Sequence, residues 1–298
     1  MISDSMGKIL VIGGTGLLGL KLVERACGKY EIYSTYHKHE IKNMPCKTFS
    51  LDKRNAKETL SLITRIRPDL VVDTAALHKV DYCEENRKEC RDINVKGTEN
   101  VARACKAAGS RMVFISTDYV FGGERGEYRE GDKPNPINYY GQCKLEAEEI
   151  VKVMNADNVI ARTAVIYGWD PDKLNFVTWT IRELKAGKEI RIVDDQYSNP
   201  TLADDLADMI IGIFERGGSG VFNTTGSECV SRFDLAKKVA ETFGLDSKLI
   251  KPIKTKDLNQ KSLRPKRCDM NVEKVTKYLG RKPLNVVQGL EKMRGDER

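Results

Sequence analysis

Short apolar runs alternate with amphipathic stretches through the first two thirds of the chain. The run Lys8-Ile-Leu-Val-Ile ends in glycine, and an apolar pattern with helical spacing follows it from Leu17 to Ala26. Comparable patterns predict strands over residues 31–36, 69–73, 111–116 and 159–163 and helices over residues 92–108 and 138–154. Because strands separated by helix-length segments are typical of a parallel sheet with helices on both faces, we expect a Rossmann-like, doubly wound α/β fold.

The last third of the chain is less regular. Apolar positions from Leu202 to Phe214 predict an amphipathic helix, and Val221-Phe-Asn predicts a late strand. The sequence Ser231-x-x-Asp234 predicts the capped start of a further helix, which should end at Gly244.

A chain of 298 residues is long enough for two structural units around a cleft. We expect residues 1–165 to form the sheet domain, completed by residues of about 200–226. Residues 166–199 and 227–298 are expected to form a smaller C-terminal lobe that closes over the carboxyl edge of the sheet.

Composition and charge narrow the function classes. With 40% hydrophobic and 31% charged residues the chain is typical of a globular protein, and no window reaches the roughly 18 apolar residues of a membrane span. The first residues lack the apolar stretch of a signal peptide. A net charge of +7 is spread among 43 acidic residues without a basic block that alternates with aromatics. An anionic cofactor and substrate therefore explain the charge better than nucleic acid or a membrane.

Eight cysteines occur without a C-x-x-C pair, so we expect free thiols in a reducing cytosol. The three histidines form no metal-ligand spacing, and we expect no metal site.

A glycine-rich string stands at the first strand-to-helix junction. It comprises Gly13, Gly14, Thr15, Gly16, Leu17, Leu18 and Gly19. Glycine lets the backbone turn tightly and approach a pyrophosphate, and the helix N-terminus offers N–H groups and a partial positive charge to the anion. Since a strand precedes the string and an amphipathic helix follows it, the pattern predicts an NAD(P)-binding loop.

The end of the second predicted strand bears on the choice of cofactor. NAD-preferring sites usually place an acid there, but this chain continues with Thr35, Tyr36, His37 and Lys38. Lys38 and His37 would attract a 2′-phosphate, so NADP(H) is favoured over NAD(H). If these are solvated turn residues, either cofactor would serve.

Tyr140 and Lys144 are the candidate catalytic pair. Their spacing of four on a predicted helix puts both side chains on one face. An ammonium beside a phenol stabilises the phenolate, so the tyrosine can exchange a proton during hydride transfer. The strand before them delivers Ser116 and Thr117 to the carboxyl edge of the sheet, where a hydroxyl can bind the reacting oxygen.

Several longer motifs occur together along the chain. They are Ser116-Thr-Asp-Tyr-Val-Phe, Pro134-x-Pro-x-Asn138-x-Tyr-Gly-x-x-Lys, Val193-Asp-Asp-Gln-x-x-x-Pro-Thr and Arg264-Pro followed by Asp269-Met-Asn. In combination they resemble the dTDP-4-dehydrorhamnose reductase family of extended short-chain dehydrogenases/reductases, and the resemblance spans nearly the whole chain.

The resemblance implies an NAD(P)H-dependent oxidoreductase of dTDP-rhamnose synthesis, which reduces the 4-keto group of a nucleotide-linked 6-deoxy sugar in its C-terminal lobe. Tyr140 would supply the proton, Lys144 would hold the cofactor ribose and Thr117 would bind the substrate oxygen. The resemblance further places Asp52, Ala75, Ala76 and Leu77 on the cofactor, and His78, Val80, Asp118 and Tyr119 on the substrate. It leaves a homodimer open.

Two features concern the substrate directly. The basic stretch of residues 261–267 is expected to meet the diphosphate through Arg264, with a solvated basic loop as the alternative. Where the family usually has Arg-Thr-Ser-Trp-Val-Tyr, this chain has Arg162-Thr-Ala-Val165-Ile-Tyr. Because the missing tryptophan is a substrate-contacting aromatic in the family, the nucleotide and the sugar stay open.

Three other functions share this architecture. A nucleotide-sugar 4,6-dehydratase would place a glutamate where Tyr119 follows Asp118, which argues against dehydration. A nucleotide-sugar epimerase would look similar to the reductase. A non-catalytic NADP-binding regulatory subunit, like that of methionine adenosyltransferase, can retain the same tyrosine and lysine.

Overall fold

A seven-stranded parallel sheet forms the centre of the computed structural model, which describes residues 6–41 and 44–297. Its strands are β1 (Lys8–Ile12), β2 (Glu31–Tyr36), β3 (Lys47–Ser50), β4 (Leu70–Asp73), β5 (Arg111–Thr117), β6 (Val159–Thr163) and β11 (Gly220–Asn223). They lie in the order β11-β6-β5-β4-β1-β2-β3, and every neighbouring pair is parallel. The order reverses between β1 and β4, which makes that point the crevice where open α/β sheets bind ligands.

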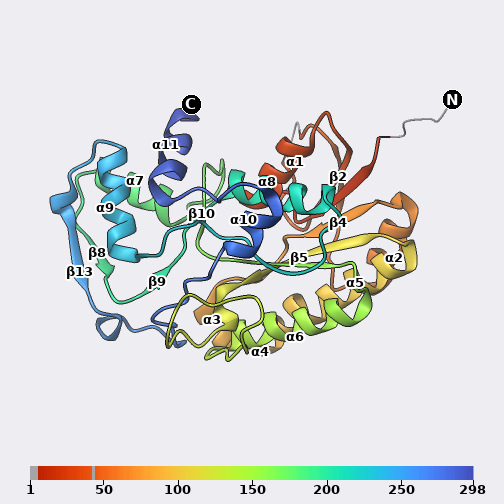
Figure 1. Ribbon diagram of the computed structural model, residues 1–298, viewed down its shortest axis with the longest axis horizontal. Helices are drawn as coiled ribbons and strands as arrows, with labels where there is room; N and C mark the ends of the chain where they lie inside the picture. The colour runs from red at the N-terminus through yellow and green to blue at the C-terminus, as the bar shows by residue number, and fades with distance from the viewer. Residues whose placement is uncertain (1–5, 42–43, 298) are drawn as a thin grey trace.

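Helices cover both faces of the sheet (Figure 1). One face carries α1 (Leu17–Ala26), α8 (Ala203–Glu215) and α10 (Glu273–Leu279), and the other carries α2 (Ala56–Ile66), α5 (Gly97–Ala108) and α6 (Tyr139–Met154). In β1, Ile9 and Val11 pack into the first core while Leu10 and Ile12 pack into the second, because successive strand residues point to opposite faces. This two-sided burial explains why the strands are continuous apolar runs.

Shorter elements lie at the carboxyl edge of the sheet and in the second lobe. The edge carries α3 (Val80–Glu85), α4 (Arg87–Arg91) and a π-helical turn (Asp92–Lys96) that leads into α5. The lobe, at the left of Figure 1, contains α7 (Phe176–Lys185), α9 (Arg232–Thr242) and α11 (Val286–Gly295). Its strand pairs are β7 (Ile166–Tyr167) with β10 (Thr201–Leu202), β8 (Ile190–Val193) with β13 (Ile250–Ile253), and β9 (Tyr197–Ser198) with β12 (Val230–Ser231).

The predicted fold class is confirmed, and most predicted elements lie within one or two residues of their observed limits. The helix predicted over residues 92–108 begins instead as the π-helical turn and becomes α-helical at Gly97. Our strand and helix predictions omitted β3 and the six short strands of the lobe, which are two to four residues long and pair non-locally. The proposed limits of the two domains stay a prediction.

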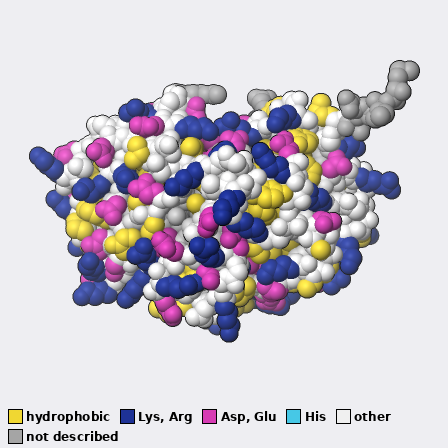
Figure 2. Space-filling model, viewed as in Figure 1, with side chains coloured by type: hydrophobic (Ala, Val, Ile, Leu, Met, Phe, Trp, Pro, Cys, Tyr) yellow, Lys and Arg dark blue, Asp and Glu magenta, His cyan; other side chains and the backbone are white. Residues whose placement is uncertain are grey.

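Lysines and arginines are interspersed with acidic side chains over the face of the molecule that Figure 2 shows. This mixture agrees with the charge pattern of the sequence. Within the described parts of the chain, no helix is long and apolar enough to cross a bilayer.

A buried ion pair connects α6 with β6. Arg162 Nε lies 2.9 Å from Glu148 Oε1, and Arg162 Nη2 lies 2.6 Å from Glu148 Oε2. The Ser116 hydroxyl donates to the same carboxylate over 2.5 Å. Both charged side chains are almost completely buried, so removing one partner alone would leave an uncompensated charge in the core. The pair thereby fixes the position of α6 against β5 and β6.

The glycine string brings α1 very close to the loop after β1. A Cβ atom at Gly19 would lie 2.5 Å from the Gly13 carbonyl oxygen and 2.6 Å from Gly14 Cα. A Cβ atom at Gly16 would meet nothing closer than 3.5 Å. Gly19 is therefore required for packing, whereas Gly16 has room for a methyl group.

We expect Gly19→Ala to lower the free energy of unfolding by about 1–3 kcal/mol, because the added methyl group must displace backbone atoms. Gly16→Ala is the matched control and should change it by less than about 0.5 kcal/mol. Urea denaturation of the cofactor-free proteins measures both values. Equal stability of the two variants would contradict the packing role of Gly19.

Candidate functional site

Two cavities open at the carboxyl edge of the sheet, beside the point where the strand order reverses. The larger one has a volume of about 470 Å³ and lies between the glycine string, the end of β5, the start of α6 and the second lobe. The smaller one, of about 90 Å³, lies between the ends of β1, β2 and β3. Together they follow the crevice in which such folds bind dinucleotides.

The glycine string has the geometry of a phosphate-binding turn. Gly13 has a φ of +81°, a conformation that favours glycine, and its N–H donates to Thr35 Oγ1 over 3.1 Å. Gly16 is the N-cap of α1, and among the described residues no side chain caps this helix end and its first turn carries no acid. The helix N-terminus thus offers its N–H groups and partial positive charge to the larger cavity, which fits the pyrophosphate of a dinucleotide.

The smaller cavity collects charged groups at the end of β2 and β3. Tyr36, His37, Asp52 and Arg54 line it. Arg54 binds Asp52 through Nε and Nη2, and Nη2 lies 2.6 Å from Oδ2. The Arg54 guanidinium holds the pKa of the Asp52 carboxyl below its usual range. A ribose or a 2′-phosphate in this cavity would therefore meet one carboxylate, one guanidinium and one imidazole.

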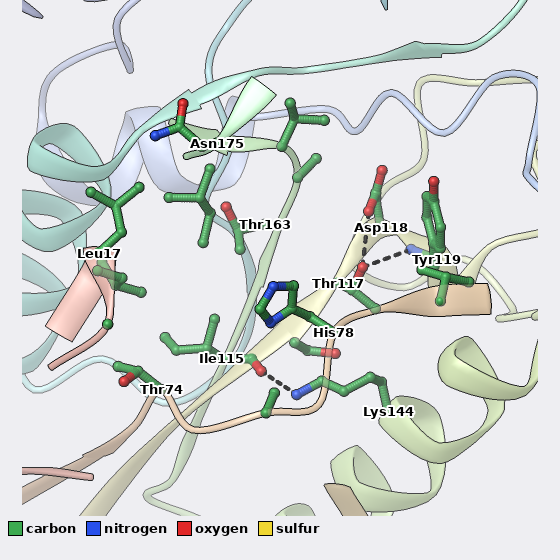
Figure 3. Close-up of a pocket in the computed structure, with 18 of the residues that line it drawn as sticks. Leu17, Thr74, His78, Ile115, Thr117, Asp118, Tyr119, Lys144, Thr163 and Asn175 are labelled. Carbon is green, nitrogen blue, oxygen red and sulfur yellow. Dashed lines mark hydrogen bonds between the residues drawn. The ribbon is translucent and has the colours of Figure 1, made fainter. Parts of the chain in front are cut away.

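The candidate catalytic residues converge on the larger cavity. Thr117 ends β5, and Tyr140 and Lys144 lie one turn apart on α6, whose N-cap Asn138 accepts a hydrogen bond from the Gly141 N–H over 2.8 Å. Lys144 Nζ donates to the Ile115 carbonyl over 2.6 Å, as Figure 3 shows. The spacing that the sequence predicted therefore brings the phenol, the ammonium and the threonine hydroxyl to one wall.

Burial changes the acid strength of both residues of the pair. Burial raises the pKa of Tyr140, the charge of Asp118 raises it further, and a hydrogen bond with Thr117 lowers it. Burial lowers the pKa of Lys144 to about 7, and the neighbouring Lys53 ammonium adds to this shift, while the carboxylates of Asp73 and Glu148 oppose it. The protonated phenol is thus the stable form of Tyr140 in the free protein.

Asp118 is a buried carboxyl group on the same wall. Its Oδ1 accepts a hydrogen bond from the Thr117 hydroxyl over 2.9 Å, and among the described residues Oδ2 has no partner (Figure 3). Burial raises the pKa of Asp118 to about 7. The second oxygen is available to a ligand hydroxyl in the cavity.

The second lobe contributes a different set of polar groups. Arg232, the first residue of α9, lines the larger cavity together with Lys173 and Asn175. The Arg232 guanidinium lies 5.2 Å from the centre of the Phe176 ring, and its charge lowers the pKa of Asp118 and Tyr119. These residues form a cationic and amide-bearing end of the cavity, opposite the glycine string.

Val165 lines this part of the cavity in an unusual backbone conformation. Its φ of +44° lies in the left-handed region, which is strained for a β-branched residue. The conformation is supported by its carbonyl, which accepts a hydrogen bond from the Thr201 N–H over 3.2 Å. A small aliphatic side chain therefore stands where the family resemblance predicts a tryptophan.

Most residues singled out from the sequence line one of the two cavities. Those at the larger cavity are Gly16, Leu17, Leu18, Gly19, Ala76, His78, Val80, Thr117, Asp118, Tyr119, Tyr140 and Lys144, and those at the smaller are Gly13, Tyr36, His37, Asp52 and Ala75. Thr15, Lys38, Leu77 and Arg264 are not among the lining residues of either cavity. Arg264 Nη2 instead pairs with Asp81 Oδ1 at 3.0 Å.

Sequence reasoning missed four charged residues of the site: Lys53, Arg54, Lys173 and Arg232. Lys53 and Arg54 follow directly after Asp52, but their spacing carries no motif. Arg232 follows the predicted N-cap Ser231, and that position was the one available signal, since the first turn of a helix at a sheet edge can face a ligand.

Comparison with known proteins gives a consistent result. The profile of the RmlD substrate binding domain family matches residues 7–297. A Haloferax volcanii protein named as a probable low-salt glycan biosynthesis reductase is 32% identical over 276 residues, which cover 91% of each chain. Methionine adenosyltransferase 2 subunit beta of Xenopus tropicalis is 28% identical over 83% of this chain and 75% of that protein.

Solved structures extend the similarity to three dimensions. The crystal structure of dTDP-4-dehydrorhamnose reductase from Bacillus anthracis, in complex with NADP, is 30% identical and superposes with a TM-score of 0.88. The superposition covers 98% of this chain and 99% of that chain. The resemblance found in the sequence motifs is thereby confirmed, and this chain belongs to the RmlD family of dTDP-4-dehydrorhamnose reductases.

Proposed function

We propose that this protein is an NADPH-dependent reductase of the 4-keto group of a nucleotide-linked 6-deoxy sugar. The observation that carries the proposal is the meeting of Tyr140, Lys144 and Thr117 on one wall of a cavity whose other end is the glycine string. A proton donor and a dinucleotide-binding turn at one cavity are the two requirements of carbonyl reduction.

The bound nicotinamide would supply hydride to the carbonyl carbon. Negative charge then grows on the carbonyl oxygen, and Tyr140 relieves it by donating its proton. Lys144 lies one helical turn away and stabilises the resulting phenolate, because an opposite charge nearby favours the charged form. Thr117 orients the reacting oxygen through its hydroxyl group. Tyr140 afterwards recovers a proton from solvent.

The substrate would lie between this wall and the second lobe. Its sugar hydroxyls meet the Asp118 carboxylate, whose Oδ2 has no partner within the described chain. Its diphosphate meets Arg232, whose guanidinium lines the cavity, and not Arg264, which is paired with Asp81. An arginine suits this role because its planar group binds phosphate oxygens in pairs.

A non-catalytic binding subunit is the second candidate. The similarity to methionine adenosyltransferase 2 subunit beta favours it, as does Val165 in place of an aromatic substrate contact. Such a protein would bind NADPH but would not oxidise it in the presence of a 4-keto sugar nucleotide. Turnover of the parent protein therefore separates the two functions.

The proton donor is tested by Tyr140→Phe, which keeps the ring and removes the proton. We expect kcat to fall by about 10² to 10⁴, the usual contribution of one positioned acid, with little change in cofactor binding. Lys144→Ala should impair both steps, and Thr117→Ala should have a milder effect. Stopped-flow loss of NADPH absorbance with dTDP-4-dehydro-6-deoxy sugars measures all three. Parent-like turnover of Tyr140→Phe would refute the mechanism.

The cofactor preference is tested at the smaller cavity. We expect NADPH to bind more tightly than NADH, because Arg54, His37 and the nearby Lys38 would contact the 2′-phosphate. Arg54→Gln should reduce the preference about tenfold, the loss of one charge-assisted hydrogen bond, and Lys38→Glu should reverse it. Arg103→Gln, on the exposed face of α5, is the matched control. Fluorescence titration decides, and equal affinities of the parent for both cofactors would contradict the assignment.

The diphosphate contact is tested by comparing two arginines. Arg232→Gln should weaken the binding of dTDP or UDP to the NADPH complex at least about tenfold, because a charged hydrogen-bond donor is lost. Arg264→Gln removes an ion pair with Asp81 and should leave this affinity within about twofold. Isothermal titration calorimetry gives both values. A larger effect of Arg264→Gln would restore the assignment made from the sequence.

A further inference from the structure

Lys53 is a buried lysine that the proposed chemistry does not use. It follows β3, and 5% of its side chain is exposed. Its ammonium lies 2.8 Å from Asp73 Oδ2 and 3.1 Å from Asp73 Oδ1, at the end of β4. It also lies 3.2 Å from Thr98 Oγ1, on α5. Burying two charges costs free energy, so a pair in this place calls for an explanation other than stability.

The pair holds the backbone of Ala75 from both sides. Lys53 Nζ donates to the Ala75 carbonyl oxygen over 2.6 Å. Asp73 Oδ1 accepts from the Ala75 N–H over 3.2 Å. Since Ala75 has no partner strand at this point, the two side chains take the place of the hydrogen bonds that a neighbouring strand would supply.

Two further contacts hold the same loop. The Asn94 side chain accepts from the Leu77 N–H and donates to the Leu77 carbonyl, each over 2.9 Å. The Thr74 hydroxyl donates to the Ile12 carbonyl over 2.8 Å, directly before the glycine string. The loop of residues 74–78 is thus held at three successive places by side chains of its own and of other elements.

The loop separates the two cavities. Ala75 lines the smaller cavity, while Thr74, Ala76 and His78 line the larger one. A shift of Ala75 would therefore change the wall of the smaller cavity and the entrance to the larger one together.

The surrounding structure is shaped to accept the lysine. Gly97 lies against the aliphatic part of Lys53, and a Cβ atom at Gly97 would lie 2.8 Å from Lys53 Cγ. Gly97 is where the π-helical turn passes into α5. The chain thus keeps a glycine at a helix start, a poor position for it in stability terms, and the side chain of Lys53 fills the space.

We propose that the Lys53–Asp73 pair is a positioning device that fixes the loop of residues 74–78 in its cofactor-binding conformation before any ligand arrives. Lys53 and Asp73 are positioning residues: they act through the Ala75 backbone and not on the reacting atoms. The proposal rests on the proposed function only in taking the smaller cavity as the site of the adenosine half of NADP(H). Its benefit is affinity, since a loop that is already ordered loses less entropy on binding.

The test is the double variant Lys53→Met/Asp73→Asn, which removes both charges and leaves neither alone in the core. Methionine keeps the length of the side chain, and asparagine can still accept from the Ala75 N–H, but the Ala75 carbonyl loses its donor. The matched control is Glu99→Gln/Arg103→Met, which removes an exposed ion pair from α5. Thermal unfolding, binding of 2′,5′-ADP and of dTDP, and hydrogen exchange of residues 74–78 are measured for each protein.

We expect the double variant to melt near the parent temperature and to bind 2′,5′-ADP about tenfold more weakly, as for the loss of a hydrogen bond to a charged group. Residues 74–78 should exchange faster, while dTDP affinity and the control variant stay within about twofold of the parent. A merely structural pair would lower the melting temperature without changing the ratio of the two affinities. Parent-like 2′,5′-ADP affinity in a folded double variant overturns the proposal.

Failure of the proposed function is a different outcome. A parent protein that binds 2′,5′-ADP but shows no reductase turnover leaves the positioning role intact. If the double variant does not fold, exchange in the ligand-free parent decides, because a preformed loop must exchange nearly as slowly as β4. Rapid exchange of residues 74–78 in the parent would overturn the proposal.

Discussion

The parallel pairing of β1 with β4 sets the geometry on which both cavities depend. Ile12 lies opposite Asp73 at the carboxyl end of this pair, and the chain leaves the sheet on both strands just beyond them. Because the connections from β1 and β4 run to opposite faces, their first residues diverge and open a crevice. The glycine string and the loop of residues 74–78 are the two lips of that crevice, and the Thr74 hydroxyl joins them.

Two buried ion pairs stabilise the elements that border this crevice. Arg162 and Glu148 fix α6 against the sheet, and α6 carries Tyr140 and Lys144 one and two turns before Glu148. Lys53 and Asp73 hold the opposite wall. In each case the charges satisfy backbone or hydroxyl groups that lie beyond the ends of the strands, where the sheet no longer pairs them. Charge at these places gives fixed geometry at a cost in stability, which suits a site whose groups must be aligned before ligand binds.

The second lobe decides which ligand the cavity accepts. Its contribution consists of Arg232, Lys173 and Asn175, together with the strained Val165. Family membership fixes the frame around the cofactor, but these residues lie where the sugar nucleotide would differ between relatives. The replacement of an aromatic side chain by Val165 leaves space at the sugar, and Arg232 adds a charge at the opposite end. Substrate identity is thus set by a few side chains on the lobe and not by the sheet.

The sequence by itself determined the features that depend on local spacing. A spacing of four placed Tyr140 and Lys144 on one helical face, and glycines after an apolar run defined the turn at Gly13, because both patterns follow from backbone geometry within one element. The tertiary structure alone decided which charges meet. Lys53 reaches Asp73 across twenty residues, and Arg232 reaches the cavity from a helix far along the chain. Such contacts arise from the way separate elements pack, and no periodicity of the sequence records them.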